Sequence, residues 1–177
     1  IDSFTDWLAS AMEELNIPEA AMVGHSMGSL IALNFAARHP DKTRALALLG
    51  TSTPMPVSES LLTAAKESDH SAIDMANNWS HSHFGKLGGN EIPGICMTMS
   101  GQRLLEQAPD NTFFSDLKAC NEFRDGESAA KSVLSETLVI VGNEDKMTSP
   151  TNALNVARNI PNSRVCRLEN CGHSMLS

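Results

Sequence analysis

The stretch Gly24-His25-Ser26-Met27-Gly28 decides how the rest of this sequence is interpreted. An apolar run at residues 20–23 precedes it and predicts a β-strand, and an apolar helical pattern at residues 30–37 follows it. A serine at so tight a strand-to-helix turn is held in a strained backbone conformation, and side chains at the two flanking glycines would collide. The turn is expected to lift the Ser26 hydroxyl above the sheet edge. The free N–H groups of the following helix would favour negative charge there.

Two later segments place an acid and a histidine after predicted strands. Residues 137–141 are continuously apolar and β-branched, which predicts a buried parallel strand, and Asp145 follows its end. Open α/β sheets keep their ligand sites at this carboxyl end of the strands. A shorter strand pattern at residues 165–168 precedes His173. The chain order serine, acid, histidine differs from the orders found in chymotrypsin and subtilisin. Glu144 remains an alternative acid beside Asp145.

On these residues the chain resembles the α/β-hydrolase family, in particular its single-domain esterase and lactonase-like branch. The matching segments are Gly24-His25-Ser26-Met27-Gly28, Gly142-Asn143-Glu144-Asp145 and Cys171-Gly172-His173. The resemblance covers most of the chain outside its middle third. It implies the α/β-hydrolase fold, in which a mostly parallel sheet is flanked by helices and carries a helical cap insertion. It also implies that Gly24 and Gly28 are the glycines of a nucleophile elbow.

The resemblance implies a role for each matching side chain. Ser26 would be the nucleophile and His173 the base that removes its proton. Asp145, which matches the family position better than Glu144 does, would hold the histidine in its useful tautomer. The backbone N–H of Met27 would be one oxyanion-hole donor, and the second donor of this family comes from a loop after an early strand. His25 is expected to be a structural residue.

The same resemblance leads us to expect a partial domain. The family's early strands, with the second oxyanion donor, would lie before Ile1, and a last helix would follow residue 177. The sheet would then have an uncovered edge. A helical pattern at residues 4–15 is expected to come just before the strand that leads to Ser26.

The middle of the chain lacks a strong strand pattern and is expected to form the cap. We expect residues 1–53 and 133–177 to form the hydrolase core and residues 54–132 to form a helical cap over the active site. Helical patterns occur at residues 58–67, 72–79, 95–107 and 113–123. Six cap side chains are candidates for an acyl pocket, although packing of the cap helices on one another explains each equally well: Trp79, Phe84, Met97, Met99, Phe113 and Phe114.

Composition excludes several other functions. The net charge of −8 argues against nucleic-acid binding and against an anionic membrane surface. The four cysteines show no CxxC or zinc spacing, which favours a reducing, cytoplasmic location, and Cys166 within its strand is expected to be buried. His81 and His83 form a His-x-His pair without an evident third ligand, so no metal site is predicted.

The predicted function is therefore that of a serine hydrolase. It would cleave a carboxylic ester or lactone of a small molecule through an acyl-enzyme, without a metal or organic cofactor. C–C bond hydrolases, thioesterases, aminopeptidases, cofactor-free haloperoxidases and non-catalytic ligand receptors share the fold and stay open as alternatives. Dehalogenases are disfavoured because they carry aspartate where Ser26 stands. Nothing in the sequence favours one oligomeric state.

Overall fold

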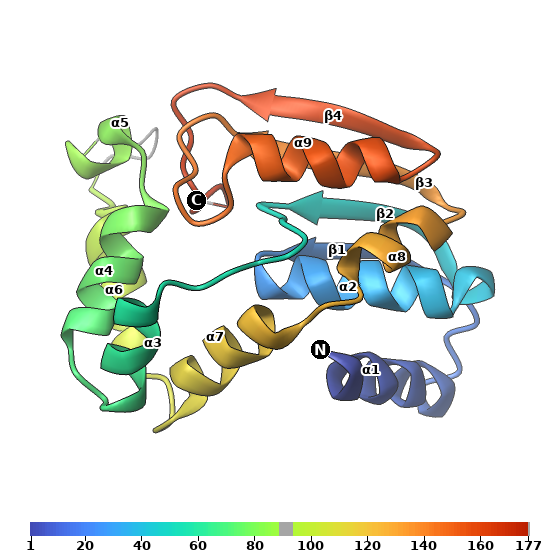
Figure 1. Cartoon of the computed structure of the whole chain (residues 1–177), viewed down its shortest axis with the longest axis horizontal. Helices are drawn as coiled ribbons and strands as arrows, with labels where there is room; N and C mark the ends of the chain where they lie inside the picture. The colour runs from blue at the N-terminus through green and yellow to red at the C-terminus, as the bar shows by residue number, and fades with distance from the viewer. Residues whose placement is uncertain (89–93, 177) are drawn as a thin grey trace.

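The computed structural model describes residues 1–88 and 94–176 and is built on a parallel sheet (Figure 1). Its strands lie in the order β1-β2-β3-β4, which is also their order along the chain, and each neighbouring pair is parallel. The strands are β1 (Ala20–His25), β2 (Thr43–Leu49), β3 (Glu136–Gly142) and β4 (Ser163–Leu168). Strands β1, β3 and β4 lie where the patterns at residues 20–23, 137–141 and 165–168 predict them. Because the strands are parallel, their carboxyl ends form one edge of the sheet.

Helices connect the strands and form the middle of the chain. The segment before β3 contains α1 (Asp2–Glu14), α2 (Met27–Arg38), a 3₁₀ turn at Pro40–Lys42, α3 (Glu59–Lys66), α4 (Ser71–Ser80), α5 (His83–Lys86), α6 (Met97–Glu106), α7 (Thr112–Glu122) and α8 (Gly126–Ser132). The last helix, α9 (Pro150–Asn159), joins β3 to β4. A capping serine and a proline mark its start: the Ser149 side chain accepts a hydrogen bond from the Asn152 N–H, and Pro150 occupies the first helical position.

The main core lies between one face of the sheet and the helices α2, α8 and α9 (Figure 1). It includes Leu33 and Phe35 from α2, Val139 from β3 and Val156 from α9, all fully buried. The helix α1 packs on α2, where the Asn34 amide donates hydrogen bonds to Asp2 and Thr5. The helix that begins directly after Ser26 is therefore fixed by the core on one side and by α1 on another.

The opposite face of the sheet carries exposed apolar side chains. Val23 is 71% exposed and Leu138 38%. Val165 of β4 is 43% exposed although it lies on the core face, since its register partner is the buried Val139. The expectation that Cys166 is buried is wrong, because β4 is an edge strand whose middle residues are exposed. All four cysteines are free.

The middle segment is helical, and helices occur in each of the four stretches where the pattern predicts them. Helices α3, α4 and α7 share a second hydrophobic cluster, centred on Leu61 and Leu117. Figure 1 shows α3 to α6 beyond the carboxyl ends of the strands, as a cap over that edge would require. The helix α8 instead packs on α2, and its Ala129 and Ala130 belong to the main core. The division into a core and a cap at residues 54–132 stays a prediction.

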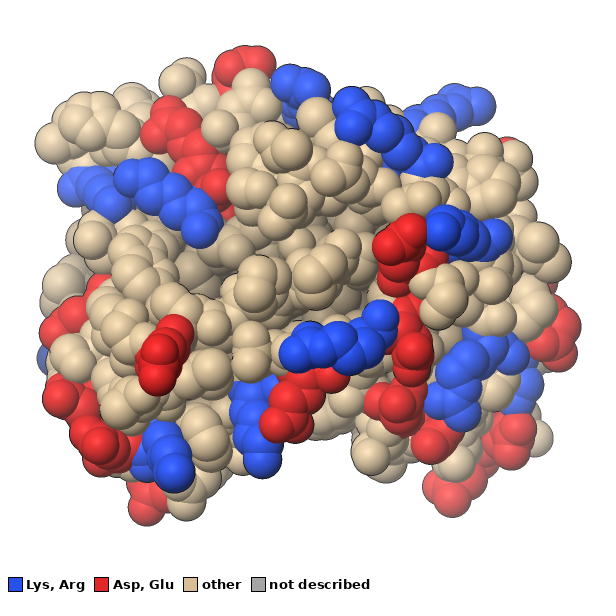
Figure 2. Space-filling model, in the orientation of Figure 1, with Lys and Arg blue, Asp and Glu red and all other residues tan. Residues whose placement is uncertain are grey.

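The surface mixes acidic and basic side chains. Figure 2 shows both signs interspersed over one face, with a hollow of uncharged surface near its centre. Within residues 1–88 and 94–176, no helix is both long enough and apolar enough to cross a membrane.

Candidate active site

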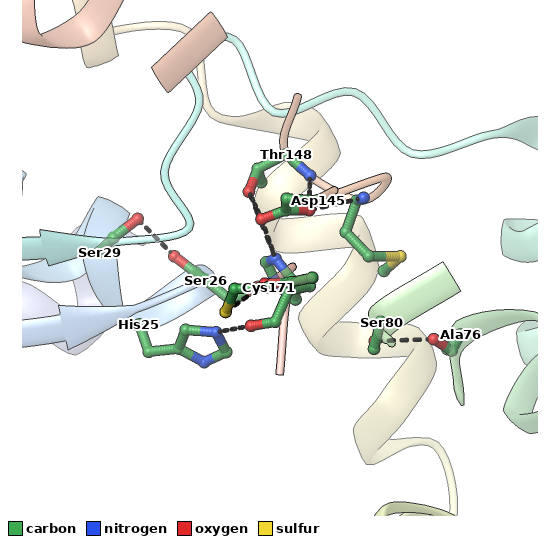
Figure 3. Close-up of polar contacts among 11 residues, drawn as sticks. His25, Ser26, Ser29, Ala76, Ser80, Asp145, Thr148 and Cys171 are labelled. Carbon is green, nitrogen blue, oxygen red and sulfur yellow. Dashed lines mark hydrogen bonds and ion pairs between the residues drawn. The ribbon is translucent and has the colours of Figure 1, made fainter. Parts of the chain in front are cut away.

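Ser26 lies at the turn between β1 and α2 in a strained conformation. Its φ of 54° and ψ of −122° fall in a region that residues with a side chain rarely occupy. The Ser26 N–H donates to the Leu49 carbonyl at 3.0 Å, which ties the turn to the end of β2. The Ser26 carbonyl accepts bonds from the N–H and the hydroxyl of Ser29, at 2.8 and 2.6 Å (Figure 3). Bonds on both sides of Ser26 therefore hold the strained backbone in place.

The two glycines of the turn have different roles. A Cβ at Gly24 would lie 2.1 Å from the Gly28 carbonyl oxygen and 2.8 Å from the Cα of Ser29. A Cβ at Gly28 would meet no atom within 4 Å beyond its own helix backbone and chain neighbours. The collision expected at both glycines therefore exists at Gly24 alone, because the backbone of Gly28 is what approaches β1.

Asp145 follows β3 and is held by four hydrogen bonds. Its Oδ1 accepts from the N–H groups of Met147 and Thr148, both at 2.8 Å. Its Oδ2 accepts from the Thr148 hydroxyl at 2.7 Å and from the His173 Nδ1–H at 2.8 Å (Figure 3). Burial acts to raise the pKa of Asp145, but the bonds from His173 and Thr148 outweigh it and leave the pKa below its ordinary value. Asp145 is therefore a buried carboxylate rather than a carboxylic acid.

His173 lies in the loop after β4 and is 5% exposed. Because its Nδ1–H donates to Asp145, its Nε2 carries the free lone pair of a neutral imidazole. Its ring lies against Gly50, where a Cβ would be 3.0 Å from the ring atoms Nδ1 and Cε1. Gly50 also has a φ of +53°, so glycine suits this position for both reasons.

His25 is hydrogen-bonded to the loop that carries His173. Its Nε2–H donates to the main-chain carbonyl of His173 at 2.8 Å (Figure 3), and the two ring centroids are 4.7 Å apart. Burial and the nearby His173 lower the pKa of His25, so this imidazole stays neutral over a wider pH range.

Ser26 and His173 are not hydrogen-bonded to each other in this conformation. Among the described residues, the Ser26 hydroxyl has no hydrogen-bond partner, whereas Asp145 and His173 are joined directly. Thr148 links the Asp145–His173 pair to the cavity that Ser26 lines. It contacts both Asp145 and His173, and it lines the same cavity as Ser26.

This cavity has a volume of about 370 Å³ and a mostly apolar lining. It lies between the serine turn, the loop after β2, the helices α3, α4 and α7, and the loop after Asp145. Its lining residues are Ser26, Met55, Pro56, Val57, Ser58, Leu61, Trp79, Leu117, Cys120, Lys146, Met147 and Thr148. Burial, followed by the charge of Asp116, raises the pKa of Cys120 to about 11, so this thiol stays protonated.

The cavity uses few of the side chains that the sequence suggested for it. Of the six aromatic and methionine candidates, Trp79 lines the described cavity. Phe113 and Phe114 pack instead against the second hydrophobic cluster. Phe84 and Met99 are more than half or half exposed, at 57% and 50%. Packing of α7 against α3 and α4 therefore accounts for its two phenylalanines.

Other expected residues are placed as follows. Met27 is the first residue of α2, and its N–H is one of those that an α-helix leaves without an intrahelical acceptor. Glu144, the alternative acid, accepts the N–H of His83 at 2.7 Å, and within residues 1–88 and 94–176 it makes no hydrogen bond to the ring of His173. His81 is buried and bonds through Nδ1 to the Asn77 carbonyl. Within the described residues, no three potential metal ligands gather at one point.

The sequence interpretation missed two residues of the site, Thr148 and Gly50. Thr148 follows closely after an acid, and Asp side chains commonly accept hydrogen bonds from the backbone of the next residues in a turn. Gly50 directly follows β2 at the sheet edge that holds the site, a place where glycine often marks a close approach.

Comparison with known proteins agrees with this architecture. Residues 1–71 match a family model described as alpha/beta hydrolase fold. Two curated 2-hydroxymuconate semialdehyde hydrolases are similar over most of the chain. The protein from Pseudomonas putida is 26% identical over 92% of this chain, and that from Pseudomonas sp. (strain CF600) is 28% identical over 97%. The chain spans 58% and 62% of the length of these two relatives.

A solved structure of a thermophilic esterase superposes with a TM-score of 0.77 at 26% identity, covering 96% of this chain and 65% of that one. The solved esterase therefore shares the architecture described above, and the two curated relatives are named as hydrolases. The chain has the α/β-hydrolase fold.

Proposed function

We propose that this chain carries the catalytic residues of a serine hydrolase that cleaves a carboxylic ester or lactone of a small molecule. One observation carries the proposal: a buried carboxylate–imidazole pair, 2.8 Å apart, lies beside a cavity that is lined by a serine in a strained turn. Buried titratable groups with shifted pKa values and residues with strained backbones both cluster at functional sites.

In the proposed reaction, Ser26 Oγ attacks the substrate carbonyl carbon while Nε2 of His173 accepts the hydroxyl proton. Asp145 stabilises the imidazolium that forms and keeps the ring oriented. The negative charge that develops on the substrate oxygen would face the Met27 N–H and the N-terminus of α2. The imidazolium then protonates the leaving alcohol, and an acyl group remains on Ser26.

Deacylation repeats these steps with water. His173 accepts a proton from water, the hydroxide attacks the acyl carbon, and the imidazolium returns the proton to Ser26 Oγ as the acid is released. Each step uses groups of this chain, the substrate and water. The absence of a Ser26–His173 hydrogen bond agrees with the longer catalytic contacts seen in unliganded enzymes, which shorten when substrate binds.

The cavity supports a substrate with an apolar acyl part. Leu61, Trp79 and Leu117 supply apolar surface, whereas Ser26 is the lining residue placed to react. A volume near 370 Å³ is at the lower end of the range for small-molecule sites. The acyl group is therefore proposed to lie under the cap with its carbonyl at Ser26.

Cleavage of a C–C bond is a second candidate, because two similar proteins are named 2-hydroxymuconate semialdehyde hydrolases. The same serine, histidine and acid serve carbon–carbon bond hydrolases of this family. The esterase that superposes at 26% identity favours the ester reaction.

A substrate panel separates these candidates. We expect p-nitrophenyl esters of graded acyl length to be hydrolysed and Ser26→Ala to be inactive on all of them. Activity on 2-hydroxymuconate semialdehyde with none on the esters would favour the C–C reaction. Equal turnover of the esters by the wild-type chain and Ser26→Ala would contradict a serine mechanism.

A further inference from the structure

The loop that carries His173 lies against the turn between α4 and α5. We call residues 171–174 the histidine loop and residues 80–83 the cap turn. The Ser174 N–H donates to the Ser80 carbonyl at 2.8 Å. At Gly172 the two segments are so close that a Cβ would lie 2.7 Å from both the Ser80 oxygen and the Ser82 nitrogen. The histidine loop is therefore in backbone contact with the cap turn, not only with the core.

Glu144 bonds to both segments at once. Its main-chain N–H donates to the Cys171 carbonyl at 2.9 Å. Its side-chain Oε2 accepts the N–H of His83 at 2.7 Å. Its backbone is thus hydrogen-bonded to the histidine loop and its carboxylate to the cap turn.

Because Glu144 is next to Asp145 in the chain, its hydrogen bonds also affect the candidate site. It directly precedes Asp145, which is bonded to His173 at 2.8 Å. A shift of about 1 Å in a catalytic group lowers a rate by about 10²-fold, so whatever fixes this loop matters for the reaction. Gly142, at the end of β3, limits the same loop from the core side, because a Cβ there would be 2.5 Å from the Gly172 oxygen.

We infer that Glu144 is a positioning residue that fastens the cap turn to the histidine loop, so that the placement of the cap helices sets the position of the His173 ring relative to Ser26. The effect on catalysis rests on the proposed serine mechanism, whereas the physical coupling of the two segments does not. In this arrangement Glu144 acts as a hydrogen-bond acceptor, and its negative charge is not required.

Three variants separate the hydrogen bond from the charge. Glu144→Ala removes the acceptor and the charge, and Glu144→Gln removes the charge but keeps an acceptor oxygen. Glu169→Ala is the matched control: Glu169 is an exposed carboxylate that accepts a 2.7 Å bond from Asn143 near the same loop, and in the described part of the chain it makes no hydrogen bond to the cap turn. Circular dichroism and thermal unfolding confirm that each variant folds.

The first measurement is amide hydrogen exchange at Ser174, whose N–H is bonded to the cap turn. We expect Glu144→Ala to speed its exchange about tenfold, the effect of weakening one hydrogen-bonded contact. Glu144→Gln and Glu169→Ala should stay within about threefold of wild type. Unchanged exchange in Glu144→Ala, or an equal increase in Glu169→Ala, would overturn the inference.

The second measurement is the rate of modification by a fluorophosphonate reagent. We expect Glu144→Ala to lower the second-order rate constant by about 10–100-fold, with Glu144→Gln restoring most of it. Equal rates for wild type and Glu144→Ala would overturn the positioning role, and a loss in Glu144→Gln as large as in Glu144→Ala would show that charge acts instead. A wild-type chain that does not react would contradict the serine mechanism, while hydrogen exchange would still decide the coupling.

Discussion

His173 donates its Nδ1–H to Asp145 at 2.8 Å, and the two side chains are only 7% and 1% exposed. In water such a pair would contribute little, but burial strengthens the interaction and fixes its geometry. The bond leaves Nε2 of His173 as the free lone pair at the edge of the sheet that also holds Ser26. The hydrogen bond between His173 and Asp145 therefore determines which ring nitrogen of His173 can act as a base.

Replacing Asp145 with asparagine should damage catalysis more than the change in size suggests. The amide of Asp145→Asn favours the wrong histidine tautomer and cannot stabilise an imidazolium. We expect kcat on a p-nitrophenyl ester to fall by about 10⁴-fold, with KM changed by much less. Glu144→Gln, in which the neighbouring carboxylate is lost instead, serves as the control. A loss below about tenfold in Asp145→Asn would contradict the role assigned to Asp145.

The same carboxylate should make stability depend on acid pH. Because the pKa of Asp145 is lower in the folded chain than its ordinary value of 3.8, its ionisation stabilises the fold above that value. This contribution is lost as the pH falls through the folded pKa, below 3.8. Urea unfolding at pH 5 and pH 3 should therefore show a larger drop in unfolding free energy for wild type than for Asp145→Asn. Equal drops would show that Asp145 is not held as a carboxylate.

The two glycines of the serine turn should respond differently to alanine. A Cβ at Gly24 would overlap the backbone of Gly28 at 2.1 Å, so Gly24→Ala should lower the free energy of unfolding by at least about 1–3 kcal/mol. At Gly28 the space is open, and alanine is the better helix former, so Gly28→Ala should change stability by less than about 1 kcal/mol. Urea midpoints measure both variants. Equal losses would mean that Gly28 is packed more tightly than the structure shows.

Trp79 should limit the size of the acyl group. Trp79→Ala enlarges the cavity that Ser26 lines, and we expect kcat/KM for a p-nitrophenyl octanoate relative to the acetate to rise by on the order of tenfold. Trp7→Ala is the matched control, because Trp7 is 68% exposed on α1 and does not line the cavity. An unchanged chain-length preference in Trp79→Ala would place the acyl group elsewhere.

Much of the fold follows from local patterns. The buried strand β3 and the helix α9 with its Ser149 cap are visible in the sequence, since continuous apolar runs and capping residues determine them locally. Cys166 was misjudged because its exposure depends on β4 being an edge strand, which is a property of the whole sheet. Strand type can be predicted from a short window, whereas burial depends on what packs against the strand.

In the candidate site, too, features set by short segments could be predicted, whereas features that depend on the packing of distant segments could not. The motifs around Ser26, Asp145 and His173 could be located because each requires particular residues beside the end of a strand. The contact between Glu144 and His83 could not, since it joins residues 61 positions apart and involves a backbone N–H. The cavity lining was also missed in large part, because the loop after β2 supplies Met55 and Val57 and has no periodic pattern.

Covalent modification of Ser26 tests the proposed serine mechanism most directly. The wild-type chain is treated with a fluorophosphonate reagent, and the modified residue is located by mass spectrometry of its peptides. We expect one added phosphonyl group on Ser26 and no modification of Ser26→Ala. We expect the rate of modification to be at least about 10³-fold lower in His173→Ala. Modification at another residue, or an equal rate in His173→Ala, would contradict the proposed mechanism.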